Sequence, residues 1–296
     1  MRPDDWYSLA DLDAFLTRAG AFLRSRPALH TVPLTVTEGL RTRGAGHYGG
    51  EAPYFGVLER DGAVRAAYFC TPPFELYVTA LAPEEADALA VHLADLGRPL
   101  TGINGEAATA AAVAEAWQRH TGGTAAEHER HRLYRLGTLT EPGPVPKGRP
   151  RVAEEADRRQ LERWHDEFTQ AVGAGAAVPA DQWADARLTY GGVTFWEDTD
   201  GTPLSMAGVT PMVAGQIRVA PVYTPAHLRG RGYAGAVTAE VSRAALAAGA
   251  QEVLLFTDLA NPTSNALYQR IGYRPVADFT VYGFTGARAV TATTAP

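Results

Sequence analysis

Several features that would point to particular classes of protein are missing from this sequence. Its single cysteine, Cys70, excludes an internal disulfide, and the strand-like stretch VRAAYFCTP around it favours a buried structural thiol. The eight histidines show no H-x-x-x-H or Cys/His spacing, so no metal site is expected. No apolar run approaches the roughly 18 to 20 residues that a membrane-spanning helix needs. The first residues carry acids where a signal peptide would carry bases.

Charge and composition exclude further classes. A net charge of -6 and a pI near 5.8 argue against a broad nucleic-acid interface. The hydrophobic content of 46% with 20% charged residues is typical of a soluble globular protein. We therefore expect a cytoplasmic protein, a monomer or homodimer, that binds neither nucleic acid nor a membrane.

One segment rich in proline and glycine, residues 141–151, divides the chain, because it can neither propagate a helix nor pair inside a sheet. It separates residues 1–140 from residues 152–285, and we expect 286–296 to be a flexible tail. Both halves follow the same order: helices, strands around a polar turn, a further strand, an Ala-rich helix, a strand leading into a last helix, and a final strand. This order predicts an α+β fold built from an internal repeat.

The second half contains Gly230-Arg-Gly232-Tyr-Ala-Gly235, between a strand-like and a helix-like run. Glycines let backbone N–H groups approach phosphate oxygens, and the start of the following helix adds unpaired donors. The neighbouring Arg229 and Arg231 match phosphate geometry. The stretch therefore predicts an anion-binding loop, with a purely structural glycine turn as the alternative.

A dinucleotide-binding loop is a second alternative, because Asp258 ends the next strand where a ribose-binding acid is expected. However, the stretch PAHLR stands between the strand and the first glycine. Only about 60 residues follow the glycines, too few for the rest of a doubly wound sheet. These two observations disfavour a nicotinamide cofactor.

The segment Arg229-Gly-Arg-Gly232-Tyr-Ala234 resembles the acyl-CoA pyrophosphate loop of the GNAT N-acetyltransferase superfamily, with the pattern Q/R-x-x-G-x-G/A. The later stretch NPTSNALYQRIGYRP is similar to the closing signature of that superfamily, with Asn261, Tyr268, Gly272 and Tyr273 in its places. The resemblance covers residues 150–285 well.

Residues 1–140 resemble the family only as a degenerate copy without either motif. At the place of the glycine loop the first half has Glu84, Glu85 and Asp87. These acids suit a helix start but would repel a pyrophosphate. The resemblance thus implies two tandem GNAT-like units, each a mixed, mostly antiparallel twisted sheet flanked by helices, with chemistry in the second alone.

The resemblance also implies a reaction: transfer of an acetyl group from acetyl-CoA, as co-substrate, to an amine of a small-molecule acceptor by direct attack through a tetrahedral intermediate. In the alternatives that stay open, the chain is a non-catalytic acyl-CoA-binding or sensor module, or a peptide or protein N-acetyltransferase. The aromatic residues between 164 and 196 are mostly expected in the core; any that line the acceptor site would favour a flat or apolar acceptor.

Site residues carry over from the resemblance position by position. Tyr268 would be the general acid, unless it is only a half-buried aromatic of an amphipathic helix. Asn261, also a possible helix N-cap, would bind the pantetheine arm with help from Asn265. Backbone groups would bind the rest of the donor: the pantetheine at Val222, Tyr223 and Thr224, and the pyrophosphate at Leu228, Arg229, Gly230, Arg231, Gly232, Tyr233 and Ala234.

The general base does not carry over. The places where many family members have a glutamate hold Phe256 and the run from Gln216 to Arg218. Asp258, Glu197 or Glu167 could act through water, or water alone could remove the proton. Each of these acids is also explained as a solvated or capping residue.

Overall fold

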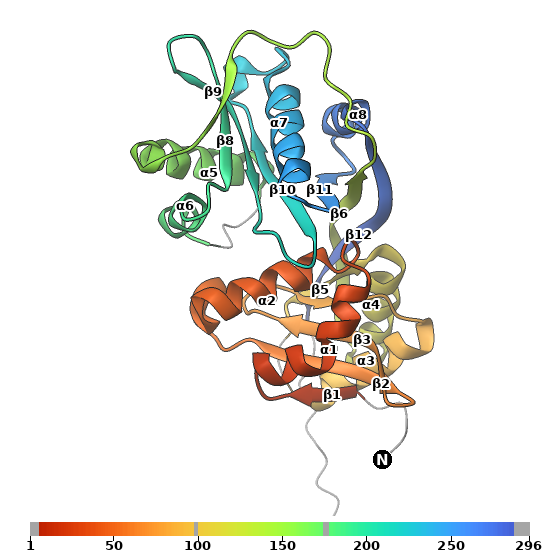
Figure 1. Ribbon diagram of the computed structural model, residues 1–296. Coiled ribbons are helices and arrows are strands. Elements are labelled where there is room, and N and C mark those ends of the chain that lie inside the picture. Colours follow the sequence, from red (N-terminus) through yellow and green to blue (C-terminus); the bar gives the residue numbers. More distant parts are fainter. Residues whose placement is uncertain (1–5, 98–99, 174–177, 287–296) are drawn as a thin grey trace, which may run out of the picture. The chain divides into compact units, whose positions relative to one another are not determined.

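The computed structural model describes residues 6–97, 100–173 and 178–286 (Figure 1). The tail expected at 286–296 lies, after Gly286, outside the described residues. The chain forms two compact units. Unit 1 comprises residues 1–132 and 277–296, and unit 2 comprises residues 133–276.

Unit 1 has the strand order β1-β2-β3-β4-β5-β12, in which β4 and β5 run parallel and each of the other neighbouring strands pairs antiparallel. Its strands are β1 (Trp6–Leu9), β2 (Tyr54–Arg60), β3 (Ala63–Cys70), β4 (Leu76–Val78), β5 (Gly102–Glu106) and part of β12 (Tyr273–Thr285). Its helices are α1 (Leu12–Ser25), α2 (Thr31–Arg43), α3 (Pro83–Asp95) and α4 (Ala107–Thr121).

Unit 2 has the order β6-β11-β10-β9-β8-β7, with β10 and β11 parallel. Its strands are part of β6 (Thr124–Leu136), β7 (Arg149–Val152), β8 (Val193–Glu197), β9 (Pro203–Val209), β10 (Gln216–Tyr223) and β11 (Glu252–Asp258). Its helices are α5 (Arg158–Val172), α6 (Ala180–Leu188), α7 (Tyr233–Ala247) and α8 (Pro262–Ile271). The α+β class and the mixed, mostly antiparallel sheet are confirmed. No helix in the described residues is long and apolar enough to cross a membrane.

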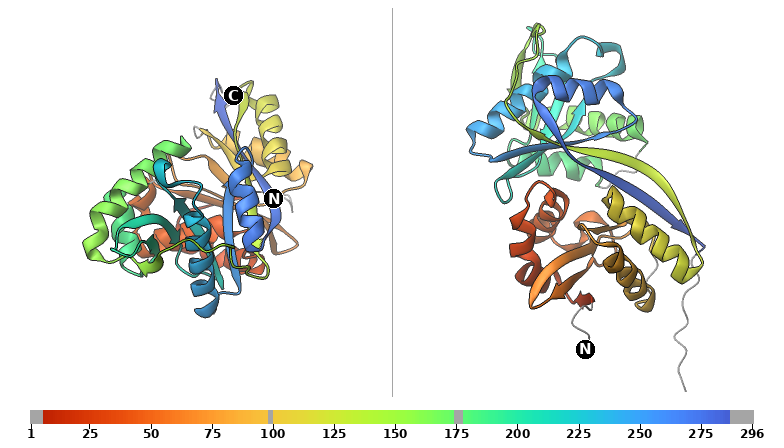
Figure 2. Two further views of the ribbon diagram at one scale, coloured as in Figure 1. Left: turned by 90° about the horizontal axis from the view of Figure 1, so that it is seen from above. Right: turned by 90° about the vertical axis from the view of Figure 1, so that its right-hand side faces the viewer.

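The last strand of the chain pairs differently from what the repeat suggests. Residues 277–285, expected to close the second half, belong to unit 1, where Phe279 to Gly283 pair with Glu106 to Gly102 of β5. The end of β6 in turn lies beside β11 of unit 2. Both β6 and β12 have 13 residues and they lie side by side (Figure 2). An alternating sequence predicts a strand, but it does not say which sheet edge that strand joins.

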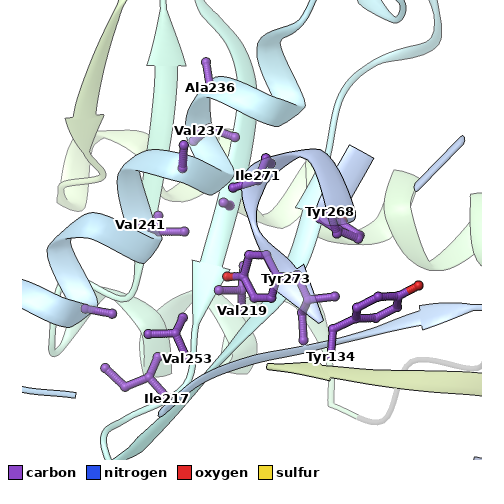
Figure 3. Close-up of a cluster of buried hydrophobic side chains, with 14 of the residues drawn as sticks. Tyr134, Ile217, Val219, Ala236, Val237, Val241, Val253, Tyr268, Ile271 and Tyr273 are labelled. Atoms are coloured by element: carbon purple, nitrogen blue, oxygen red, sulfur yellow. The ribbon is translucent and has the colours of Figure 1, made fainter. Parts of the chain in front are cut away.

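The core of unit 2 fixes the position of α7. Val237 and Val241 of α7 pack in one buried cluster with Val219 of β10 and Val253 of β11 (Figure 3). Each fully buried valine contributes roughly 1.5 to 3 kcal/mol. Because this face of the helix is held on the sheet, the start of α7 is held at the carboxyl end of β10.

Candidate functional site

The parallel strands β10 and β11 stop pairing before they end. Their pairs run from Gln216–Glu252 to Val219–Leu255, while β10 continues to residue 223 and β11 to residue 258 without a further pair in the described chain. An extended ligand could hydrogen-bond there as an added strand does. Both strands therefore extend beyond the last residue pair that joins them.

A β-bulge in β10 lies at this point. Its antiparallel register with β9 shifts between Val219 and Val222, on either side of Ala220 and Pro221. Pro221 has no N–H and cannot extend a ladder. A Cβ at Gly208 of β9 would lie 2.7 Å from the Ala220 carbonyl oxygen, so glycine is needed opposite the bulge.

The backbone predicted to contact pantetheine is partly occupied by other hydrogen bonds. Ser205 Oγ donates to the Tyr223 carbonyl at 3.0 Å, and Arg229 Nε donates to the Thr224 carbonyl at 3.0 Å. Val222 and Tyr223 are also paired with Ala207 and Met206 of β9, so only backbone groups that face away from β9 are candidates for ligand contact.

The loop between β10 and α7 carries the glycine motif. After the short 3-10 helix Ala226–Leu228, Gly230 and Gly232 adopt φ values of 76° and 87°. Such a left-handed conformation costs other residues roughly 1–2 kcal/mol. Gly232 is also the N-cap of α7 and supplies no side chain there, so nothing covers the start of the helix from this position.

The N–H groups of residues 230–235 have no hydrogen-bond acceptor within the described part of the chain. The first bond of α7 runs from Ala236 N to Gly232 O at 3.0 Å. The first turn contains no acidic residue, and the helix extends for 15 residues. Free N–H groups and the helix dipole together favour an anion at this position.

Two of the predicted phosphate contacts need correction. The N–H groups of Leu228 and Arg229 donate to Pro225 O at 2.9 Å and Ala226 O at 3.3 Å, so they close the 3-10 turn instead of facing a ligand. The Arg231 side chain donates to His227 O at 3.1 Å, as that of Arg229 does to Thr224 O. Both guanidinium groups therefore hold the loop in shape.

Asn261 and Asn265 at the start of α8 have different roles. Asn261 Oδ1 accepts from Ser264 N at 3.0 Å as a helix N-cap, and its Nδ2 has no partner in the described chain. Asn265 Nδ2 donates to the carbonyls of Asp258 and Asn261, each at 2.8 Å, and its Oδ1 accepts from Tyr134 at 2.9 Å. Asn261 thus keeps a donor for a ligand, whereas Asn265 is used within the fold and is not supported as a ligand residue.

Tyr268 lies on α8 with 8% of its surface exposed. Its ring meets that of Tyr273 edge-on at 6.1 Å, and its hydroxyl has no partner in the residues described. Burial raises the pKa of Tyr268 to about 12, so the phenol is protonated at neutral pH and can act as a donor. Tyr273, by contrast, is bonded to Ser242 Oγ at 2.7 Å and belongs to the core.

The three candidate bases are in different surroundings. Glu197 is 1% exposed and binds Arg149 Nη2 at 2.9 Å and Arg151 Nε at 2.6 Å. The hydrogen bond from Arg151, with a smaller contribution from Arg149, lowers the pKa of Glu197, which is therefore structural and a poor base. Asp258 Oδ1 accepts from Ala260 N at 2.7 Å and caps the turn after β11.

Glu167 on α5 is the candidate that contacts the end of β10. Its Oε2 accepts a 2.7 Å hydrogen bond from the Tyr223 hydroxyl. The Tyr223 ring packs edge-on against Trp164 at 5.8 Å, and Trp164 packs against Phe195 at 5.6 Å. Burial, then the bond to Glu167, raises the pKa of Tyr223 to about 12. The carboxylate of Glu167, with its side chain 41% exposed, combines a fixed position with access from solvent.

Unit 1 repeats the order of strand, helix, parallel strand and helix but closes the equivalent position. At the start of α3, Glu85 Oε2 accepts from Ala82 N at 2.9 Å, and Glu85 Oε1 lies 3.7 Å from Arg60 Nη1. Thr109 Oγ1 accepts from Leu81 N at 3.0 Å. Side chains of unit 1 therefore occupy two backbone donors at this position, the N–H groups of Leu81 and Ala82.

Comparison with known proteins agrees with this geometry. The pattern of the FR47-like protein family matches residues 212–281, which include β10, the loop, β11 and α8. A GCN5-related N-acetyltransferase from Sphaerobacter thermophilus superposes with a TM-score of 0.66 and 17% identity over 100% of both chains. A GNAT-family acetyltransferase from Colwellia psychrerythraea gives 0.60 and 12% identity, over 95% of this chain and 100% of the other.

A tandem GNAT protein from the clavulanic acid biosynthesis pathway gives a TM-score of 0.56 and 14% identity, over 95% of this chain and 98% of that one. No match is found among curated proteins. The protein therefore has the fold of the GNAT acetyltransferases. The resemblance inferred from Arg229–Ala234 and Asn261–Tyr273 is confirmed.

Proposed function

We propose that the protein is an acetyl-CoA-dependent N-acetyltransferase that acetylates an amine of a small molecule, with the donor bound in unit 2. The observation that carries the proposal is the set of N–H groups at residues 230–235 without an acceptor, at the carboxyl end of a parallel strand pair that stops pairing. Pyrophosphate suits the N–H groups and an extended amide-containing arm suits the strand ends.

The protein groups without an internal hydrogen bond provide the contacts to acetyl-CoA. The N–H groups of residues 230–235 bind the pyrophosphate, and backbone groups near Val222 bind the pantetheine arm. Asn261 Nδ2 donates to a carbonyl of that arm while its Oδ1 caps α8. Because its oxygen caps the helix and its nitrogen donates to the ligand, one asparagine can serve both as N-cap and as binding residue.

The chemistry assigns one task to each of three groups. The acceptor nitrogen forms a bond to the thioester carbonyl carbon, and backbone N–H groups near Val222 stabilise the oxyanion. Glu167 takes the proton of the attacking amine, directly or through one water, and Tyr223 holds the carboxylate in position. The C–S bond then breaks, and Tyr268 donates to the departing sulfur.

The pKa of Tyr268 sets a limit on that last step. The pKa of this phenol, about 12, is about 3.5 units above the thiol pKa of about 8.5. Complete transfer of its proton to a free thiolate is therefore unfavourable by about 5 kcal/mol. Tyr268 therefore acts mainly as a hydrogen-bond donor to sulfur as its charge develops, and solvent completes the protonation.

The test is a panel of primary amines incubated with acetyl-CoA, with release of the free thiol as the readout. Acceptor-dependent thiol release, with the acetylated amine identified by mass spectrometry, supports the proposal. Binding of acetyl-CoA without turnover of any amine, including those of peptides, would instead favour a sensor module. Turnover of peptides alone would make the protein a peptide N-acetyltransferase.

A further inference from the structure

The segment that separates the two halves of the sequence is fixed on unit 2. Residues 137–148, which we call the strap, join β6 to β7. In the strand order, β11, β10, β9 and β8 all lie between these two strands. The strap must therefore cross the whole sheet of unit 2, and it does so from the side of α8 to the side of β8, past the start of α7 (Figures 1 and 2).

Both ends of the strap are attached. At the first end, Gly137 N donates to Gly272 O at 3.0 Å and Thr140 N to Ile271 O at 2.8 Å, both at the end of α8. At the second end, the indole of Trp196 donates to Lys147 O at 3.2 Å. Between them Glu141 forms an ion pair with Arg243 of α7. Such a segment is a built part of the unit rather than a free spacer.

The middle of the strap lies against the phosphate loop. A Cβ at Gly232 would lie 3.7 Å from Cδ of Pro146, and a Cβ at Gly235 would lie 3.7 Å from Cβ of Pro142. Both glycines belong to the stretch with free N–H groups. The prolines stiffen the strap at these contacts, because their rings fix φ.

The residue after Pro146 is Lys147, the only lysine in the sequence. It is exposed, and its ammonium forms no ion pair with any described residue. Consecutive Cα atoms are 3.8 Å apart, and a lysine ammonium sits on a flexible four-carbon stem. Lys147 can therefore reach an anion held at Gly232. The two arginines of the loop are instead turned to the carbonyls of Thr224 and His227.

We propose that the strap forms a second wall of the nucleotide end of the donor site, and that Lys147 binds a phosphate of the coenzyme. Pro142 and Pro146 place the strap against the start of α7, and the ammonium adds a positive charge from the strap to that of the loop arginines, each of which also donates to a loop carbonyl. This inference rests on the proposed donor site and adds to it a binding residue outside both sequence motifs.

The test compares CoA, 3′-dephospho-CoA and pantetheine by calorimetry on the intact protein and on Lys147→Gln. The variant should bind CoA about tenfold more weakly and pantetheine unchanged, since a charge-assisted contact to phosphate is lost. The slope of log affinity against log salt should also become shallower. If only the affinity for CoA falls, the ammonium contacts the 3′-phosphate. If the affinity for 3′-dephospho-CoA falls equally, it contacts the pyrophosphate.

Controls separate this inference from the proposed function. Lys147→Arg should retain most of the affinity, and Arg159→Gln, which removes a similar exposed charge on α5, should leave binding unchanged. Wild-type affinity for CoA in Lys147→Gln overturns the inference while leaving the donor site intact. No binding of CoA by the intact protein overturns both.

A second readout uses Lys147 itself. Because it is the only ε-amino group, its reaction with an amine-reactive acetylating reagent appears as a mass shift on a single internal peptide. CoA should slow this reaction several-fold and pantetheine should not. Equal protection by both ligands, or by neither, contradicts a phosphate contact.

Discussion

The hydroxyl of Tyr223 donates a 2.7 Å hydrogen bond to Oε2 of Glu167 and so joins the end of β10 to α5. The bond places a carboxylate beside the strand on which we place the acyl donor. Neither residue stands where the family usually has its glutamate. In the mechanism that we propose, the pair supplies, from α5, the base that the positions at Phe256 and Gln216–Arg218 lack.

Replacing Glu167 by Gln should lower kcat by about 10²-fold, because a positioned general base typically contributes 10²- to 10⁴-fold. The affinity for acetyl-CoA should stay the same. Tyr223→Phe keeps the carboxylate but removes its hydrogen bond and leaves Arg163 Nε at 4.0 Å, so kcat should fall less. Steady-state kinetics with one amine would measure both. Full activity of Glu167→Gln would assign proton removal to water.

Tyr268→Phe should lower kcat by about 10²-fold without changing thermal stability, since the hydroxyl has no partner in the described chain. Tyr273→Phe, the matched control, loses the bond to Ser242 and should cost about 1 kcal/mol of unfolding free energy with little effect on kcat. Because the pKa of Tyr268 is about 12, its titration should produce no alkaline fall in rate below about pH 11. A stability loss in Tyr268→Phe equal to that of Tyr273→Phe, with kcat unchanged, would make Tyr268 a core residue only.

Asn261→Asp should weaken acetyl-CoA binding about tenfold while α8 keeps its N-cap. Aspartate still accepts from Ser264 N and suits a helix start, but it replaces the free Nδ2 donor by an acceptor oxygen. Calorimetry and thermal unfolding would be measured on the same sample. Unchanged affinity would limit Asn261 to its capping role.

The carboxylate of Glu197 should make stability depend on pH in the acid range. Its pKa is lowered in the folded state, so its contribution is present above the unfolded value near 4.3 and is lost as pH falls through the folded value. In urea unfolding, Glu197→Gln should be less stable by about 1–3 kcal/mol at pH 7 and should show a shallower decline below pH 5. Glu162→Gln on α5 is the control. Parallel declines in wild type and Glu197→Gln would contradict this assignment.

The motifs of the site could be predicted from the sequence because they are local. Glycines at positive φ and an N-cap at Asn261 act within a few residues of their own position. The bulge opposite Gly208 depends on a neighbouring strand, and one of the internal bonds of Asn265 comes from Tyr134, far away in the sequence. In the sequence, the bulge is indicated by Pro221, a proline within a strand-like run.

Two larger features also escaped prediction for physical reasons. The pairing of β12 with β5 and the position of β6 beside β11 depend on which edges are open, which a hydrophobic pattern does not encode. The proline-rich segment predicts only that no regular element forms there. Its packing on Gly232 and Gly235 follows from the strand order of unit 2, because its two ends lie on opposite sides of the sheet.

The most direct test of the central claim is calorimetric titration of acetyl-CoA into the intact protein, Gly232→Glu and Gly249→Glu. Gly249 has positive φ, as Gly232 does, but it has open space around it and follows the opposite end of α7. We predict one acetyl-CoA per chain, loss of binding in Gly232→Glu and normal binding in Gly249→Glu. Equal binding by all three proteins, or two molecules bound per chain, would contradict a single donor site at the start of α7.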